Sequence, residues 1–270
     1  MYKIIGIYPT SIAGALIIKG LLKGFENLGN TVLGVDIREI DKNVILKFKP
    51  DLIIGYDYAH FFEKKAEEII KSLNIPVIHY FGDDPLTDFS HSGKTELINK
   101  LYQSDDMIFC WDRQCLKFFN KRVFYLPLGI DADLYKPIPD KQVLSEIVFV
   151  GRPLTQKRLD ILTTIIANFP DKLSIFCYEK HFDMSLQEIT KLNYLTSAQI
   201  EDYKRAYKGF VRTENELARI YSNAKICLNI TEQGYEGVNY RVFEVLASGG
   251  FLLTDHMKGI KEMFQPNNDL

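Results

Sequence analysis

Short apolar runs alternate with amphipathic stretches along the first half of the chain, and this alternation predicts strands separated by helices. Helical spacing of apolar positions is clearest at residues 15–27 and 61–73, each of which lies between two of these runs. Strands that alternate with helices form parallel sheets covered by helices on both faces. The first half therefore predicts a doubly wound α/β domain. Its expected strands are residues 3–8, 31–35, 52–56, 76–81, 107–110 and 123–126.

A second series of the same kind follows a polar, proline-bearing stretch at residues 131–145. Residues 184–207 of this series are expected to be mostly helical. We therefore predict two α/β domains, 1–130 and 146–270, joined by a linker at 131–145. The expected strands of the second domain are residues 146–150, 173–176, 225–230 and 251–253.

Ligands of doubly wound sheets bind beyond the carboxyl ends of the strands. The expected strand 3–8 is followed by residues 9–14, a turn of small residues that ends at Gly14 and lets the backbone approach a ligand closely. The turn lacks the GxGxxG spacing of dinucleotide-binding loops, so it does not by itself predict a dinucleotide site.

Two adjacent acids, Asp83 and Asp84, follow the expected strand 76–81 and precede Pro85. At the carboxyl end of a strand such a pair suits a general base, a hydroxyl-binding site or a metal site. An ordinary turn is the alternative, because aspartate and proline are common turn residues. No third ligand accompanies the pair in the sequence, so we expect no metal site.

A second candidate site follows the expected strand 146–150, where Gly151 is succeeded by Arg152, Lys157 and Arg158. Glycine allows close approach of the backbone, and cations at the entrance of the next helix favour a bound anion. Solvated basic residues on a surface loop are the alternative.

The segment 235–255 combines a loop, a helix, a glycine stop and a short buried strand. Asn239 stands at the expected helix entrance, where unpaired amides suit a phosphate, and Arg241 adds a cation. Glu236 in the loop and Glu244 on the helix offer carboxylates, which accept hydrogen bonds from the neutral hydroxyls of a sugar or ribose. The alternative is an ordinary Arg/Glu pair on a surface helix.

Composition narrows the class of protein. Of 270 residues, 46% are hydrophobic and 25% are charged, as in ordinary globular proteins. The formal net charge of −2 argues against a nucleic-acid partner, so any anion site is expected to be local.

Four cysteines without metal-type spacing, and a start that does not resemble a signal segment, favour the cytoplasm. No apolar run reaches the roughly 20 residues that span a bilayer, so membrane contact is expected to be peripheral at most.

Three motifs of the second half resemble group 1 glycosyltransferases of the GT-B fold, in which two Rossmann-like domains with parallel sheets face each other across a cleft. Gly151 and Arg152 with Lys157 resemble the Gly-Arg…Lys element of that group. Glu236 and Glu244 resemble its paired-glutamate motif, and residues 209–224 contain segments similar to the module that precedes the donor site.

From about residue 76 to the end, the chain is similar to the CgeB-like, spore-maturation-type group of this superfamily. The chain departs from the usual pattern at Arg158, at Ser248 and at 239–241, which leaves the donor base and sugar open. The similar residues are Asp83-Asp84-Pro85, 126–131, Arg241, Phe243-Glu244 and 249–255.

The resemblance implies a cytoplasmic, retaining glycosyltransferase that moves a sugar from a nucleotide-sugar donor to an unknown glycan, glycolipid or protein acceptor. No cofactor and no bound metal are expected. Glu244 is expected to bind the ribose, while Glu236, and Asp83 or Asp84, are expected to position the sugar or activate the acceptor. The residues expected to bind the donor diphosphate are Arg152, Lys157, Arg241, Asn239 and Gly14.

Two other functions fit the same pattern. A non-catalytic module of this fold would bind a nucleotide-sugar without transferring it, and a nucleotide-sugar epimerase shares the architecture. Relatives continue beyond the polar residues 264–270 with helices that complete the second domain. The chain is therefore expected to be a truncated or shortened member of the group.

Overall fold

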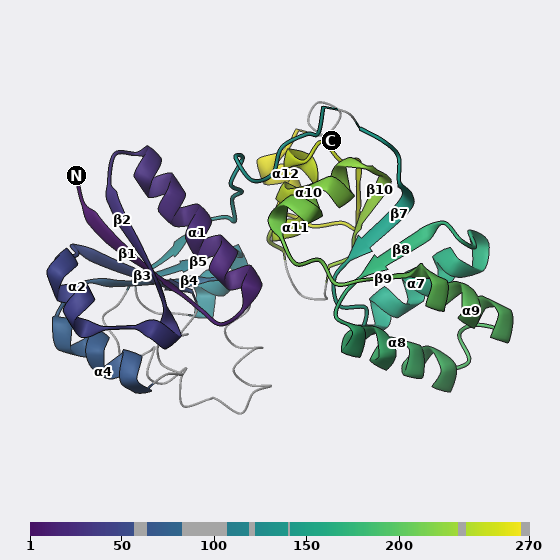
Figure 1. The fold of residues 1–270 in the computed structure, drawn as a ribbon, viewed down its shortest axis with the longest axis horizontal. Coiled ribbons are helices and arrows are strands. Elements are labelled where there is room, and N and C mark those ends of the chain that lie inside the picture. Colours follow the sequence, from purple (N-terminus) through teal and green to yellow (C-terminus); the bar gives the residue numbers. More distant parts are fainter. Residues whose placement is uncertain (57–63, 83–106, 119–121, 140, 232–235, 266–270) are drawn as a thin grey trace. The chain divides into compact units, whose positions relative to one another are not determined.

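The structure, a computed structural model, describes residues 1–56, 64–82, 107–118, 122–139, 141–231 and 236–265 (Figure 1). These residues form two compact units, each built on one parallel sheet. The predicted α/β class with two parallel sheets is confirmed. The chain passes from unit 1 to unit 2 between Gly129 and Ile130.

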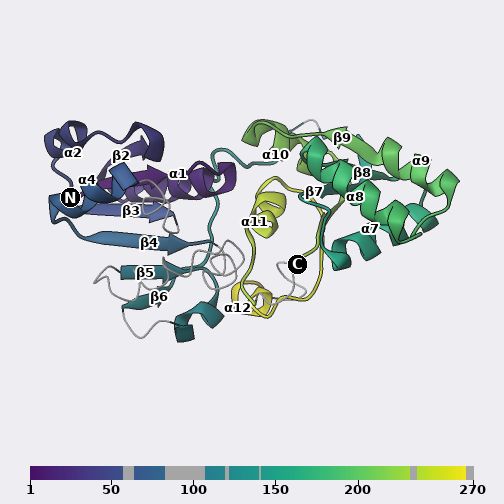
Figure 2. The ribbon, with the colours of Figure 1, turned by 90° about the horizontal axis from the view of Figure 1, so that it is seen from below.

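Unit 1 contains a six-stranded sheet in the order β2-β1-β3-β4-β5-β6, in which all neighbours are parallel. Figure 2 shows β3 to β6 side by side in this order. Its strands are β1 (Lys3–Tyr8), β2 (Thr31–Asp36), β3 (Leu52–Tyr56), β4 (Val77–Phe81), β5 (Met107–Cys110) and β6 (Val123–Tyr125). Its helical elements are α1 (Ile12–Asn27), η1 (Ile37–Glu39), α2 (Lys42–Phe48), α4 (Lys64–Leu73), η2 (Arg113–Phe118) and α12 (Ile260–Met263).

Alternate residues of β1 explain why helices cover both faces of this sheet. Ile5 and Ile7 belong to a buried cluster that also contains Ile45 of α2 and Ile70 of α4. Gly6 points to the other face, where a Cβ atom at this position would lie 2.6 Å from Cδ1 of Leu22 in α1. Accordingly, α1 lies on one side of the sheet and α2 and α4 lie on the other (Figure 1).

Unit 2 contains a five-stranded parallel sheet in the order β11-β10-β7-β8-β9. After β9 the chain returns to the other side of β7, so the winding direction reverses between β7 and β10. Ligands of open α/β sheets bind beyond the carboxyl ends of the strands at such a point. The strands are β7 (Ser145–Val150), β8 (Leu173–Phe176), β9 (Tyr207–Gly209), β10 (Ala224–Asn229) and β11 (Leu252–Thr254). The helices are α7 (Gln156–Asn168), α8 (Glu179–Lys191), α9 (Ser197–Ala206), α10 (Glu214–Ser222) and α11 (Tyr240–Ala247).

The second sheet is also covered on both faces. Phe149 of β7 is packed in one buried cluster with residues of α7, α8 and α9, whereas its neighbour Val148 is packed in another with Tyr221 of α10 and Val245 of α11. Figure 1 shows α7, α8 and α9 on one side of this sheet and α10 and α11 on the other. Among the described helices, none has the length and apolar character needed to cross a bilayer.

Two features of the fold differ from the sequence-based expectation. Helices α8 and α9 cover most of 184–206, as expected, but the edge strand β9 at 207–209, which pairs with β8, was not among the expected strands. This strand is three residues long and includes Lys208 and Gly209, so it carries no alternating apolar pattern. Tertiary pairing with β8, not local propensity, makes it a strand.

The second difference concerns two segments of the predicted C-terminal domain 146–270, one internal and one at its end. Residues 236–238 and 257–265 group with unit 1 and not with the sheet of unit 2. The amide of Gly259 donates to the carbonyl of Glu236 at 2.8 Å, and the amide of Glu236 donates to Oδ2 of Asp112 at 2.9 Å. These bonds attach both segments to the residues that follow β5.

Candidate functional site

Two helices of unit 2 begin beside the carboxyl ends of β7 and β10. Thr155 is the N-cap of α7 and Asn239 is the N-cap of α11, and neither side chain bonds the first amides of its own helix. The first amides of a helix lack intrahelical partners and carry a partial positive charge. This edge of the sheet therefore suits an anion.

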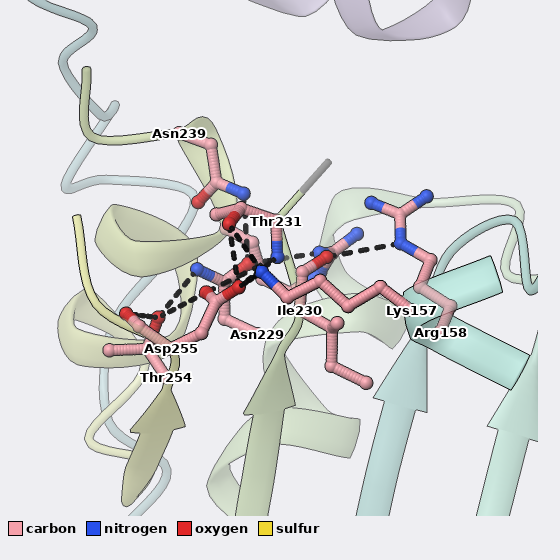
Figure 3. Close-up of polar contacts among 9 residues, drawn as sticks. Lys157, Arg158, Asn229, Ile230, Thr231, Asn239, Thr254 and Asp255 are labelled. Atoms are coloured by element: carbon pink, nitrogen blue, oxygen red, sulfur yellow. Dashed lines mark hydrogen bonds and ion pairs between the residues drawn. The ribbon is translucent and has the colours of Figure 1, made fainter. Parts of the chain in front are cut away.

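Asn229, the last residue of β10, connects three parts of this edge (Figure 3). Its Oδ1 accepts hydrogen bonds from Nδ2 of Asn239 at 2.8 Å and from Nη1 of Arg241 at 3.1 Å. Its Nδ2 donates to Oγ1 of Thr254 at 2.9 Å. Because Asn229 is only 1% exposed, these bonds are shielded from water and fix the start of α11.

Arg241 lies against β7 and the loop that follows it. Its guanidinium carbon is 5.7 Å from the centroid of the Phe149 ring, which positions the charge by a cation–π contact. A Cβ atom at Gly151 would lie 2.7 Å from Nη2 of Arg241, so glycine makes room for this side chain. Within the described residues, the buried Nε of Arg241 has no hydrogen-bond partner. Arg241 is therefore held in place between Asn229 and the Phe149 ring.

Lys157, in the first turn of α7, is held by Asp255, which directly follows β11 (Figure 3). The Lys157 ammonium forms an ion pair with Oδ2 of Asp255, and this oxygen also accepts hydrogen bonds from the amide and hydroxyl of Thr231 at 3.0 and 2.6 Å. Burial raises the pKa of Asp255, but the hydrogen bonds from Lys157 and Thr231 outweigh it, and the pKa is lowered. An ionised Asp255 thus places the ammonium beside the end of β10.

The other two cations of the predicted basic element have different surroundings. Arg158 is only 8% exposed; its Nε donates to the carbonyl of Ile230 and its Nη1 to the carbonyl of Arg152, each at 3.0 Å. Arg158 thus ties the β7–α7 loop to the end of β10. Arg152 is exposed, and it forms no ion pair with any residue that the structure describes. Of the three cations, Arg152 is the one most accessible to a ligand.

Glu244 is buried inside unit 2. The alternative prediction from the sequence, an ordinary Arg/Glu pair on a surface helix, places it on the surface instead. Glu244 is 8% exposed, and its Oε1 and Oε2 accept hydrogen bonds from the hydroxyls of Tyr135 at 3.0 Å and Tyr221 at 3.3 Å. Burial raises the pKa of Glu244, while Arg241 and the two tyrosines lower it in part. Tyr135 belongs to the predicted linker 131–145 and was not recognised from the sequence as part of a site.

The raised pKa of Glu244 predicts a pH-dependent stability difference between the wild type and Glu244→Gln. The ionised carboxylate disfavours the folded state, and this contribution disappears as the pH falls through the folded pKa toward the ordinary glutamate value of about 4.3. The wild type is expected to gain stability relative to Glu244→Gln, which cannot titrate, as the pH is lowered. Urea unfolding of both proteins at a series of pH values measures the difference. A difference that is constant, or that changes in the opposite direction, would contradict the raised pKa.

Glu236 belongs to unit 1, where its backbone amide donates a hydrogen bond to the Asp112 carboxylate. Its carboxylate forms an ion pair with Lys258, and the hydrogen bond from Lys258 lowers the pKa of Glu236. Asp112 is 1% exposed, and its Oδ1 accepts a hydrogen bond from the amide of Gln114 at 2.9 Å. Glu236 is thus an ionised, partly exposed carboxylate on an anchored loop.

The remaining predicted site residues lie in the N-terminal half. Gly14 is in the first turn of α1, where a Cβ atom would lie 2.7 Å from Pro9, Ser11 and Tyr56. The close approach at Gly14 is therefore made by the protein's own side chains. Asp83 and Asp84 lie outside the described residues. Across the described ranges, no group of three or more His, Cys, Asp and Glu side chains has the arrangement of a metal site.

Residues 180–270 match the sequence model of a family described as glycosyl transferase-like. No curated protein matches the sequence. Solved structures of similar fold include sucrose-phosphate synthase from Thermosynechococcus elongatus, with a TM-score of 0.66 and 11% identity over 98% of this chain and 84% of that one. An alpha-glucosyltransferase, in complex with UDP and DNA, has a TM-score of 0.67 and 13% identity over 94% of this chain and 79% of that one.

HepE from Anabaena, in complex with UDP-glucose, has a TM-score of 0.63 and 14% identity over 98% of this chain and 83% of that one. The structural similarity establishes the fold, but at identities this low it does not establish the activity. The similarity extends over nearly the whole chain and both of its sheets. The chain therefore has the GT-B fold of these glycosyltransferases, and its last third matches a glycosyl transferase-like family.

Proposed function

We propose that the protein is a retaining glycosyltransferase that binds the diphosphate of a nucleotide-sugar donor at the carboxyl ends of β7 and β10. The observation that carries the proposal is the convergence of Lys157 and Arg241 with two helix N-termini at the winding reversal of unit 2. Arg152 adds an exposed cation in the loop after β7. Two of the similar structures contain UDP or UDP-glucose, which supports a nucleotide-sugar and makes UDP the first probe.

Transfer breaks the bond between the anomeric carbon and the diphosphate oxygen, and the bonding electrons leave with the diphosphate. Cations that are already in position stabilise this developing negative charge without reorganising. Arg241 is positioned by Asn229 and Phe149, and Lys157 is positioned by Asp255. A new bond then forms between the anomeric carbon and the acceptor oxygen, whose proton passes to a base that we leave unassigned.

The two glutamates have different roles in this proposal. Glu244 accepts hydrogen bonds from the ribose hydroxyls, and Glu236 positions the transferred sugar. Their surroundings agree with separate roles, since Glu244 is buried between two tyrosines whereas Glu236 is partly exposed beside Lys258. Asp83 or Asp84 is the proposed residue for holding the sugar or activating the acceptor.

Product analysis with UDP-glucose and other nucleotide-sugars tests the proposed activity. Release of free UDP together with the sugar, or with a glycosylated acceptor, indicates transfer or hydrolysis. An intact nucleotide-sugar with altered stereochemistry would indicate an epimerase instead. Binding without turnover in the presence of candidate acceptors would indicate a binding module. Because no metal is part of the proposal, EDTA is expected to leave the rate unchanged.

Glu236→Gln is expected to lower turnover and to leave the affinity for free UDP unchanged, because Glu236 touches only the sugar in this proposal. Steady-state rates and calorimetric titration with UDP measure the two quantities. Glu262→Gln is the matched control, since Glu262 is an exposed glutamate of the same unit in an ion pair with Arg113. If Glu236→Gln weakens UDP binding, or turns over at the wild-type rate, the sugar-positioning role is wrong.

A further inference from the structure

The residues around Tyr135 hold its hydroxyl in position beside Glu244. A turn places Tyr135, because its amide donates to the carbonyl of Asp131 at 3.1 Å. The ring packs edge-on against Tyr240 of α11, with centroids 6.4 Å apart and planes at 88°. Tyr135 is 1% exposed, so its hydroxyl has little freedom to turn toward water. The 3.0 Å bond to Oε1 of Glu244 is therefore a fixed contact.

Tyr221 supplies a second phenol from a different element, α10, and its hydroxyl lies 3.3 Å from Oε2 of Glu244. Each oxygen of a carboxylate offers two acceptor sites. The tyrosines occupy one site on each oxygen, so each oxygen retains a second acceptor site. Two adjacent hydroxyls match this remaining pair of acceptors.

We infer that Tyr135 and Tyr221 are positioning residues that orient Glu244 to accept hydrogen bonds from the 2′- and 3′-hydroxyls of a ribose, which makes the site selective against 2′-deoxyribonucleotides. The inference rests on the proposed nucleotide-sugar function. A buried carboxylate with a single fixed donor can rotate about its Cγ–Cδ bond. Two phenols on opposite oxygens restrict that rotation.

The charged and titratable groups around Glu244 are Arg241 and Tyr240 on its own helix, Tyr135 in the turn that begins at Asp131, and Tyr221 on α10. Both hydrogen-bonding tyrosines stay neutral because burial raises the pKa of each phenol. They therefore act as donors to Glu244, and removing one hydroxyl changes a hydrogen bond and not a charge.

Calorimetric titrations with UDP and 2′-deoxyUDP, and with GDP and 2′-deoxyGDP, test the inference. The wild type is expected to prefer one ribonucleotide over its deoxy form by about tenfold, the value of one hydrogen bond to a charged group. Tyr135→Phe and Tyr221→Phe are each expected to lose most of this preference. Tyr203→Phe is the matched control, because Tyr203 is a fully buried tyrosine of the same unit whose hydroxyl is 2.9 Å from Ser185. It is expected to keep the preference.

A purely structural role for the tyrosines is distinguished by a double-mutant cycle. If Tyr135 acts through Glu244, Tyr135→Phe has no further effect on ribose preference in the Glu244→Gln background. Full preference in both single tyrosine variants, or an additive effect in the double variant, would overturn the inference while the proposed function stands. If the wild type binds none of these nucleotides, the proposed function is overturned, and the inference with it.

Discussion

Gly151→Ala is expected to lower the free energy of unfolding by about 1–3 kcal/mol and to weaken UDP binding. Gly151 has a φ of +147°, a backbone conformation that favours glycine, and the added methyl carbon would lie 2.7 Å from Nη2 of Arg241. The backbone strain accounts for the loss of stability. The contact displaces Arg241, which accounts for the loss of binding. Thermal unfolding and calorimetric titration with UDP measure the two effects.

Gly209→Ala separates these two causes. Gly209 also has a positive φ, +97°, but a Cβ atom at this position has nothing within 4 Å. Its alanine variant should therefore lose stability and retain UDP affinity. If Gly151→Ala also retains UDP affinity, Arg241 does not bind the donor from the position observed.

Arg241→Gln is expected to weaken UDP binding about tenfold to a hundredfold, because a hydrogen bond from a charged donor to phosphate is worth about 1.5–3 kcal/mol. Glutamine retains the polar end of the side chain and removes its charge. The matched control is Arg205→Gln, since Arg205 is an exposed arginine of α9 in the same unit, paired with Asp171 and Asp202. Equal UDP affinities for the wild type and Arg241→Gln would exclude Arg241 from the diphosphate site.

Much of the fold follows from local patterns in the sequence. Successive residues of the strand at 146–150 pack on opposite faces of its sheet. The apolar run of this strand and the helical patterns beside it predict that both faces are covered. The edge strand β9 has no such pattern and depends on its partner β8. The grouping of residues 236–238 with unit 1 depends on a bond to Asp112, a residue more than a hundred positions away in the chain. Sequence spacing carries no information about that contact.

The candidate site was predictable to the extent that its residues lie close together in the chain. Gly151, Arg152 and Lys157 follow one strand, and Asn239 and Arg241 begin one helix. The residues that hold these side chains were missed because they come from separate elements: Asn229 ends β10, Asp255 follows β11, and Tyr135 lies in a segment predicted to be a linker. Arg158 shows the converse case, since a cation beside the predicted anion site binds backbone carbonyls instead.

A crystal structure of the protein with UDP tests the central claim most directly. The proposed function predicts that the diphosphate lies at the carboxyl ends of β7 and β10, within hydrogen-bond distance of Lys157 and Arg241 and of the first amides of α11. It also predicts that the ribose hydroxyls lie on the free acceptor sites of Glu244. A UDP molecule bound elsewhere, with no ligand near Lys157 or Arg241, would contradict the account.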